Sequence, residues 1–267
     1  MRHLAALDLD AVPGLVSVWC GPTAGPPTYQ RHPDATHYAA STMKVAVLAA
    51  LYAGGHDLDQ EITVHNEFAG VTGDTYGLQR RHDEDDDVWR RLGRTATLGW
   101  LAARMVTYSS NLATNLVLEQ VGLPTVDAVW RAVGAGTSTV RRGLGDTAAA
   151  DAGITNTVTA EDLGRLFAAI ARGELAGSDE MLATLLDQRR TEDLAAGLPA
   201  GTRVAHKNGW IMGVRHGAGV VFPGDAPPFV LAVCLTTPWA INRTDDKACQ
   251  IVSEIAGAAW ADRHELG

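Results

Sequence analysis

The order of the predicted elements is what most constrains the fold of this chain of 267 residues. One short β-branched run, Leu15 to Cys20, lies near the N-terminus between Pro-Gly and Gly-Pro pairs and predicts a strand, and Tyr29 to Arg31 is a second candidate. The other strand-like runs come only near the C-terminus: Arg203 to Lys207, Val214 to Phe222 and Phe229 to Thr236. Both ends of the chain therefore build one α/β unit, and the residues between them form an insert.

The insert has helical periodicity. Ser41 to Tyr52 contains no Gly or Pro and is apolar on all sides, which predicts a buried helix with Ser41 or Thr42 at its N-cap. Further helices are predicted over Leu98 to Val106, Leu112 to Gln120, Val126 to Val133, Ala160 to Ala171 and Asp179 to Arg189. Apolar residues at helical spacing between 248 and 259 predict a C-terminal helix that packs on the sheet.

These elements predict an α+β chain, in which an antiparallel sheet is flanked by helices from both termini. We expect an α/β domain of residues 1–40 and 198–267 and an all-α domain of residues 41–197, with the active site at their interface. The acidic run Asp83 to Asp87 lies in the long irregular connection after the first helix of the insert, and it does not fit the spacing of a calcium loop. We predict that this run is a solvated loop.

Composition and charge exclude several functions. A net charge of −9 gives no basic footprint for a nucleic acid or an anionic membrane surface. Asp8 and Asp10 interrupt the apolar core that a secretory signal needs, and the longest apolar stretches fall far short of the roughly 20 residues of a membrane span. Cys20, Cys234 and Cys249 show no C-x-x-C spacing, which argues against a disulfide framework or a zinc cluster. We expect a cytoplasmic protein.

The lysines are informative because only Lys44, Lys207 and Lys247 are present. Ser41-Thr42-Met43-Lys44 is an S-x-x-K motif, and about 0.08 such pairs are expected by chance in a chain with so few serines and lysines. At positions i and i+3 of a helix the two side chains share a face, so the amine can reach the hydroxyl. A desolvated lysine beside a second cation can be neutral enough to activate a serine. The alternative is that Ser41 caps the helix while Lys44 extends into solvent.

Two further motifs follow in the chain. Ser109-Ser110-Asn111 lies at the junction of two predicted helices, where a serine would also serve as an N-cap. Lys207-Asn208-Gly209 ends a predicted strand, where an Asn-Gly pair alone would indicate a type I′ hairpin turn. In this order, S-x-x-K, S-x-N and K-x-G are the three signature elements of serine β-lactamases and penicillin-binding proteins. The chain resembles the class A β-lactamase family, and the resemblance covers nearly its whole length.

The resemblance implies roles for the motif residues. Ser41 is the expected nucleophile and Lys44 its proton acceptor, while Ser109 passes the proton to the leaving group. Asn111 is expected to bind the side-chain amide of the substrate. Lys207 is expected to complete a hydrogen-bond network with Ser109 and to place positive charge near a substrate carboxylate.

The same resemblance implies an oxyanion hole formed by the backbone N–H groups of Ser41 and Trp210. Asn208 and Gly209 complete the substrate-binding strand. Arg215, eight positions after the motif lysine, is a candidate second anchor for the carboxylate, and its alternative is an exposed strand arginine.

The chain departs from the family pattern at three places. Asn208 stands where the third motif has a hydroxyl residue, and Ser110 replaces an acid in the second. The family's E-x-x-L-N loop carries the glutamate that activates the deacylating water, but residues 141–156 contain only Asp146 and Asp151 as acids. Asp146 is the candidate replacement base, and slow deacylation is expected.

We therefore expect a serine hydrolase without metal or cofactor that forms an acyl-enzyme on Ser41. Its substrate is a small amide, lactam or ester, expected to carry a carboxylate. Two alternatives stay open: an esterase or acyltransferase acting on a biosynthetic intermediate, and a β-lactam-binding sensor that is acylated without turnover. The oligomeric state is left open.

Overall fold

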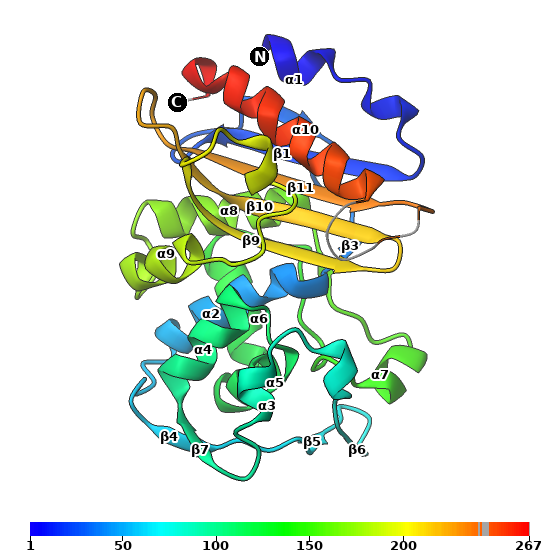
Figure 1. Ribbon diagram of the computed structural model, residues 1–267, viewed down its shortest axis with the longest axis vertical. Coiled ribbons are helices and arrows are strands. Elements are labelled where there is room, and N and C mark those ends of the chain that lie inside the picture. Colours follow the sequence, from blue (N-terminus) through cyan, green and yellow to red (C-terminus); the bar gives the residue numbers. More distant parts are fainter. Residues whose placement is uncertain (240, 242–245, 267) are drawn as a thin grey trace.

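A five-stranded antiparallel sheet forms the upper half of the molecule (Figure 1). The computed structural model describes residues 1–239, 241 and 246–266. The strand order is β2-β1-β11-β10-β9, so the N-terminal strands pair directly with the last strand of the chain, as the element order predicts. The strands are β1 (Leu15–Pro22), β2 (Tyr29–Arg31), β9 (Arg203–Ile211), β10 (Val214–Phe222) and β11 (Phe229–Thr236).

Successive side chains of each strand point to opposite faces of the sheet, and both faces carry apolar side chains. On β11, Leu231 and Val233 face the outer layer, where α1 (Arg2–Ala6) and α10 (Lys247–Ala261) pack. Ala232 and Cys234 face the helical layer below the sheet. The two termini thus lie together on the outer face (Figure 1), and the predicted C-terminal helix is confirmed.

The helical layer contains the predicted insert. Its helices are α2 (Lys44–Ala53), α3 (Asp86–Trp89), α4 (Leu98–Thr107), α5 (Asn111–Val121), α6 (Leu123–Ala132), α7 (Thr147–Asp151), α8 (Ala160–Ala171) and α9 (Ser178–Leu186). α8 lies directly against β1, β10 and β11, and a Cβ built on its Gly164 would lie 2.5 Å from the Trp19 ring. One contiguous core therefore joins the helical layer to the inner face of the sheet.

The insert is not entirely helical. Two two-stranded ribbons lie within it: β4 (Glu61–Thr63) pairs with β7 (Thr95–Thr97), and β5 (Phe68–Ala69) pairs with β6 (Thr75–Tyr76). A third ribbon pairs its β8 (Thr157–Val158) with β3 (His37–Tyr38), which precedes the insert. Short 3-10 turns cover Leu9–Ala11, Ala40–Met43, Arg80–His82, Ala195–Gly197 and Arg263–Glu265. Within the part of the chain that the structure describes, no helix has the length and apolarity to span a membrane.

One strand is longer than its pattern predicts. β9 continues through Lys207, Asn208 and Gly209 to Ile211, because all of these residues pair with β10. The chain reverses only at Met212 and Gly213, where Gly213 has a φ of +76°. Asn208-Gly209 is therefore not a hairpin turn, and the third motif lies inside an edge strand.

Candidate active site

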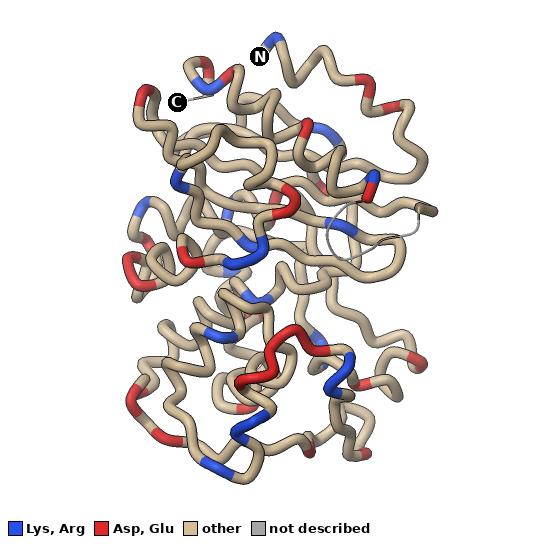
Figure 2. The backbone as a smooth tube through the Cα atoms, in the orientation of Figure 1, with Lys and Arg blue, Asp and Glu red and all other residues tan. Residues whose placement is uncertain are grey.

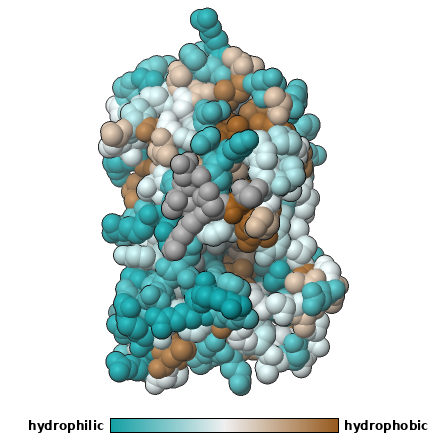
Figure 3. Space-filling view, turned by 45° about the vertical axis from the view of Figure 1, so that its right-hand side comes forward, coloured by the Kyte–Doolittle hydropathy of each residue, from teal (hydrophilic) through white to brown (hydrophobic). Residues whose placement is uncertain are grey.

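A cavity of about 800 Å³ opens between β9 and the helical layer. The space-filling view shows the molecule hollowed between its upper and lower parts, with hydrophobic atoms beside the hollow (Figure 3). All three motifs reach this cavity, which is lined by Ser41, Ser109, Asn111, Asn208, Gly209 and Trp210. Ile211 and Met212, which are 42% and 73% exposed, belong to its apolar wall. Residues far apart in sequence thus meet at one site.

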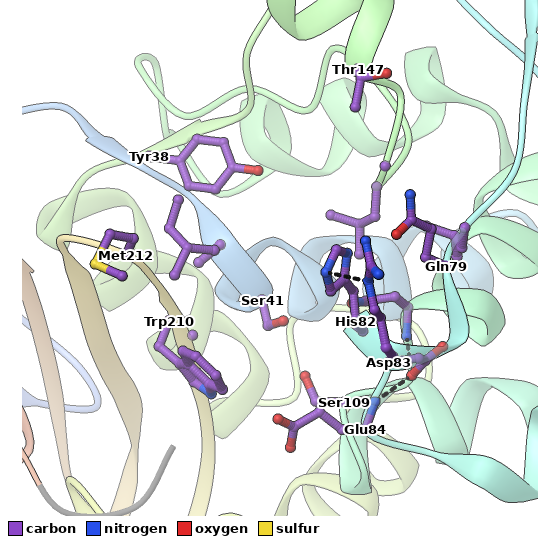
Figure 4. A pocket seen from close by; sticks show the side chains of 18 of the residues that line it. Tyr38, Ser41, Gln79, His82, Asp83, Glu84, Ser109, Thr147, Trp210 and Met212 are labelled. Carbon is purple, nitrogen blue, oxygen red and sulfur yellow. Dashed lines mark hydrogen bonds between the residues drawn. The ribbon is translucent and has the colours of Figure 1, made fainter. Parts of the chain in front are cut away.

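Ser41 lies in the 3-10 turn that leads into α2. Its side chain is half-buried and points into the cavity (Figure 4). Neither Ser41 nor Thr42 caps the helix as predicted: no side chain caps this turn, and the Thr42 hydroxyl donates to the Ala39 carbonyl at 2.6 Å. Ala40 has a φ of +45°, which is costly for a residue with a side chain. The backbone is therefore held in an unusual conformation just before the serine.

Gly209 allows β9 to pass close to the start of α2. A Cβ at this position would lie 2.8 Å from the Ser41 amide nitrogen and 2.9 Å from that of Thr42. Real Cβ atoms essentially never make contacts this short, so only glycine fits here without moving its neighbours. The glycine of the third motif thus brings the strand that carries Trp210 next to the Ser41 amide.

Lys44 is completely buried and connects the first motif to the second. Its Nζ lies 2.7 Å from the Ser109 carbonyl oxygen, 3.1 Å from Ser109 Oγ and 2.9 Å from Asn111 Oδ1. Burial and the nearby charge of Lys207 hold the pKa of Lys44 well below its ordinary value. The amine thus donates to two oxygens of Ser109 and to the amide oxygen of Asn111. Among the described residues, Lys44 hydrogen-bonds Ser109 rather than Ser41.

Ser109 is a strained residue at the junction of α4 and α5. Its φ is +59°, a conformation that costs a residue with a side chain about 1–3 kcal/mol and that is found mainly at functional sites. Ser110 is the N-cap of α5 and accepts from the Ala113 amide at 3.2 Å, so the capping prediction holds for this residue. Ser110 therefore serves the helix, while its neighbours Ser109 and Asn111 line the cavity.

The acidic run is a structural element rather than a solvated loop, so this prediction is wrong. It forms one continuous acidic stretch beside the helical layer (Figure 2). Asp83 accepts hydrogen bonds from the backbone amides of Asn111 and Leu112, at 3.0 and 2.8 Å. Asp85 is buried and accepts from Arg104 Nε at 2.6 Å. Asp83 therefore fixes the position of the second motif, because it binds the N-terminus of α5, which begins at Asn111 of that motif.

The third motif continues into a buried polar network. Lys207 donates to the Asn208 carbonyl at 2.9 Å and to Asn208 Oδ1 at 3.2 Å, and Asn208 Nδ2 donates to Asp193 at 3.1 Å. Burial lowers the pKa of Lys207 to about 7 and raises the pKa of Asp193 to about 6. Asn208 can bridge the two because an amide both donates and accepts. The expected bond from Lys207 to Ser109 does not occur among the described residues.

Arg215 does not line the cavity, so its predicted role as a carboxylate anchor is corrected. Its side chain is fully buried behind the strand, and its guanidinium lies 3.1 Å from Asp246 and 3.5 Å from Asp193. It is not an exposed strand arginine either. Its charge is compensated by carboxylates of the protein itself.

Asp146 is also corrected, from a candidate base to a helix cap. It is fully buried and accepts from the backbone amides of Ala149 and Val71, at 3.0 and 3.2 Å. Asp151, the other acid of the loop, is exposed and does not line the cavity. The loop residues that line the cavity are Leu144, Gly145 and Thr147, and none of them carries a carboxylate.

Sequence reasoning assigned none of the charged residues of the cavity wall to the site: these are Arg81, Asp83, Glu84 and Arg190. Glu84 and Arg190 form an ion pair with each other. Glu84 projects toward the region of Ser109 (Figure 4). In the sequence, Glu84 cannot be distinguished from its neighbours in the acidic run. Arg190 is one of 19 arginines, and no motif surrounds it. Only the tertiary structure brings them together.

A serine at a helix start, a buried lysine one turn later and a second serine bound to that lysine define a serine hydrolase site. The model of the β-lactamase enzyme family (Beta-lactamase2) matches residues 1–262. A β-lactamase of Streptomyces fradiae is 29% identical over 204 residues, which are 74% of this chain and 65% of that protein's length.

Solved structures give the same result. PBP-A superposes with a TM-score of 0.79 at 20% identity, covering 99% of this chain and 95% of that one. A variant of the last common ancestor of Gram-negative class A β-lactamases superposes with a TM-score of 0.79 at 26% identity, covering 97% and 96%. The chain belongs to the β-lactamase enzyme family and has the class A β-lactamase fold.

Proposed function

We propose that the protein acylates Ser41 with β-lactams or closely related small amides and esters, and that it releases the acyl group slowly. The observation that carries the first step is the buried Lys44 amine on the Ser109 hydroxyl, beside a cavity that Ser41 faces. The family membership supports a β-lactam as the substrate class.

Acylation follows from this arrangement. Ser41 Oγ attacks the carbonyl carbon of the substrate while its proton passes to the unprotonated amine of Lys44. As the bond from the carbonyl carbon to the leaving nitrogen or oxygen breaks, Ser109 Oγ donates its proton to the leaving atom and takes up the proton held by Lys44, from which it lies 3.1 Å away. The backbone N–H groups of Ser41 and Trp210 stabilise the oxyanion, at the position where Gly209 brings strand and helix together. The positive charge of Lys207 favours an anionic substrate.

Slow deacylation is proposed because the loop of residues 141–156 offers no carboxylate to the cavity. The loop residues that line the cavity are Leu144, Gly145 and Thr147, and Asp146 is occupied as a helix cap. The same observation favours a second candidate function, a lactam sensor that keeps its acyl group. A cytoplasmic location remains a proposal that suits such a role.

Intact-protein mass spectrometry after mixing with a chromogenic cephalosporin tests the proposal. We expect an adduct that maps to Ser41 and persists after the free cephalosporin is removed. An adduct at Ser109 or Ser110 contradicts the site assignment. Fast release contradicts slow deacylation, and the absence of both adduct and product points to the esterase or acyltransferase alternative, which a panel of activated esters can then examine.

A further inference from the structure

Two buried histidines attach β3, the short strand that leads to Ser41, to the inner face of the sheet. His37 lies on β3 itself, and its Nε2 is 2.9 Å from Ser17 Oγ on β1 while its Nδ1 is 2.8 Å from Thr236 Oγ1 on β11. His216 lies on β10, with its ring edge-on to that of His37 and the two ring centroids 5.5 Å apart. Both rings are almost completely shielded from solvent.

The two ring nitrogens of His216 each have a backbone partner, and these partners fix its tautomer. The Leu235 amide donates to Nδ1 at 3.2 Å, so Nδ1 carries no proton. Nε2 then carries the proton of the neutral ring and donates to the Tyr38 carbonyl oxygen at 2.8 Å. Burial lowers the pKa of His216 to about 4, so the ring is neutral at neutral pH. The sheet thus donates a hydrogen bond to the chain three residues before Ser41.

The segment that His216 holds contains the strained residue Ala40, whose φ is +45°. Such a conformation persists only where the surrounding structure fixes the chain around it. The Ala39 amide donates to the Asn156 carbonyl at 2.9 Å, and the Thr42 amide donates to the Ala39 carbonyl at 3.2 Å. These bonds attach the segment to the residues before β8 and to itself. The bond from His216 attaches its backbone to the five-stranded sheet.

His216 also lies next to the strand of the third motif. In the pairing of β10 with β9, it is directly opposite Gly209, the residue at which β9 passes close to the Ser41 amide. The sheet therefore contacts the Ser41 segment at two neighbouring points, the backbone of Gly209 and the ring of His216. A shift of the segment away from the sheet would separate the amides of Ser41 and Trp210, and it would have to break the His216 bond.

We propose that His216 is a positioning residue for the acylation of Ser41. By holding the Tyr38 carbonyl against β10, it sets the distance between the Ser41 and Trp210 amides, which form the proposed oxyanion hole. His216 does not line the cavity, so it acts through the backbone and not on the substrate. His37 supports this role by attaching β3 to β1 and β11. The inference rests on the proposed function, because acylation is the step that the position of Ser41 serves.

Two variants of His216 separate its hydrogen bond from the bulk of its ring. Phe fills the space but cannot donate to Tyr38, whereas Gln keeps an N–H donor near the position of Nε2. We expect His216→Phe to lower the second-order rate constant of acylation by a cephalosporin about 30-fold, because a 1 Å misplacement of reacting groups costs about 100-fold. His216→Gln should stay within about 5-fold of the wild type, since the donor is kept. A folded His216→Phe variant with the wild-type rate would overturn the proposal, and so would equal losses in the two variants.

His206→Phe is the matched control. His206 is buried on the neighbouring strand β9, but its Nδ1 has no hydrogen-bond partner among the described residues. The same substitution there removes no bond to the Ser41 segment, so acylation should stay within about 3-fold of the wild type. A loss in His206→Phe that equals the loss in His216→Phe contradicts the assignment, because the effect would then not depend on the bond to Tyr38.

Two measurements need no acylation and so separate this inference from the proposed function. In His216→Phe, amide hydrogen exchange of residues 38–43 should be at least about 10-fold faster than in the wild type, while α8 keeps its exchange rates. That result supports the role of His216 even if no adduct forms on the wild type, and unchanged exchange of residues 38–43 overturns it. In the wild type, ¹⁵N NMR should show His216 as the neutral Nε2–H tautomer at neutral pH, and an Nδ1–H tautomer would also overturn the proposal.

Discussion

Gly209→Ala is expected to damage acylation more than stability. The new Cβ would meet the Ser41 amide nitrogen at 2.8 Å, so the strand and the start of α2 must separate by about 0.6 Å to reach an ordinary contact. Overpacking of this kind costs about 1–3 kcal/mol of folding free energy. Because a 1 Å misplacement of reacting groups costs about 100-fold in rate, a shift of this size should slow acylation by about 10- to 30-fold.

The assay is the pre-steady-state burst with a chromogenic cephalosporin, combined with a thermal melt. Gly21→Ala is the matched control, because its Cβ would also meet backbone, at 2.6 Å from Pro27 Cα and 2.9 Å from the Thr28 nitrogen. This contact lies between β1 and the residues that lead into β2, and none of these residues lines the cavity. The control should lose similar stability and keep the wild-type burst rate. A wild-type burst in Gly209→Ala would refute the role of this close approach in the oxyanion hole.

Other variants test the remaining groups. Asp193→Asn removes the negative charge that raises the pKa of Lys207, so that pKa falls below about 7 and the alkaline limb of the acylation rate moves to lower pH; an unchanged limb would count against Lys207 as the titrating cation. Asp146→Ala should lower stability by about 1 kcal/mol through loss of a helix cap, measured by chemical denaturation, with steady-state turnover unaffected. Lys44→Ala and Lys207→Ala should each slow acylation at least about 100-fold while Lys247→Ala leaves it unchanged, and comparable losses at all three would indicate a folding defect.

The strands of the sheet were predictable because they are short, rich in β-branched residues and separated by turn residues. The helices of the insert were predictable because their apolar residues recur at helical spacing. The exceptions arise where tertiary contacts decide the outcome. Asn208-Gly209 carries a turn signal, yet pairing with β10 keeps both residues in the strand. The start of α2 forms a 3-10 turn instead of a capped helix, at the point where the strand backbone at Gly209 passes close to it.

The site was predictable where a motif fixes it and unpredictable where only geometry does. The three motifs meet in one cavity, as the resemblance implies, although the individual roles remain predictions. Arg215 could bind a carboxylate and Asp146 could act as a base, but both are buried and neither lines the cavity. The sequence does not show on which side of the backbone their side chains lie. Glu84 and Arg190 carry no motif at all, and they become site residues only through the way Asp83 and Gln188 fix their segments.

We propose that Ser41 is acylated quickly and that its acyl group is released slowly, because the loop of residues 141–156 presents Leu144 to the cavity and no carboxylate. The backbone of Leu144 is held by two hydrogen bonds of 2.8 Å to the Asn115 side chain, so a substitution there keeps its direction. The decisive measurement is the burst and steady state of wild type and Leu144→Glu with one penicillin. We predict one fast equivalent and slow turnover for the wild type, and a steady state at least about 100-fold faster with an unchanged burst for Leu144→Glu. Rapid linear turnover by the wild type, without a burst, would contradict the account.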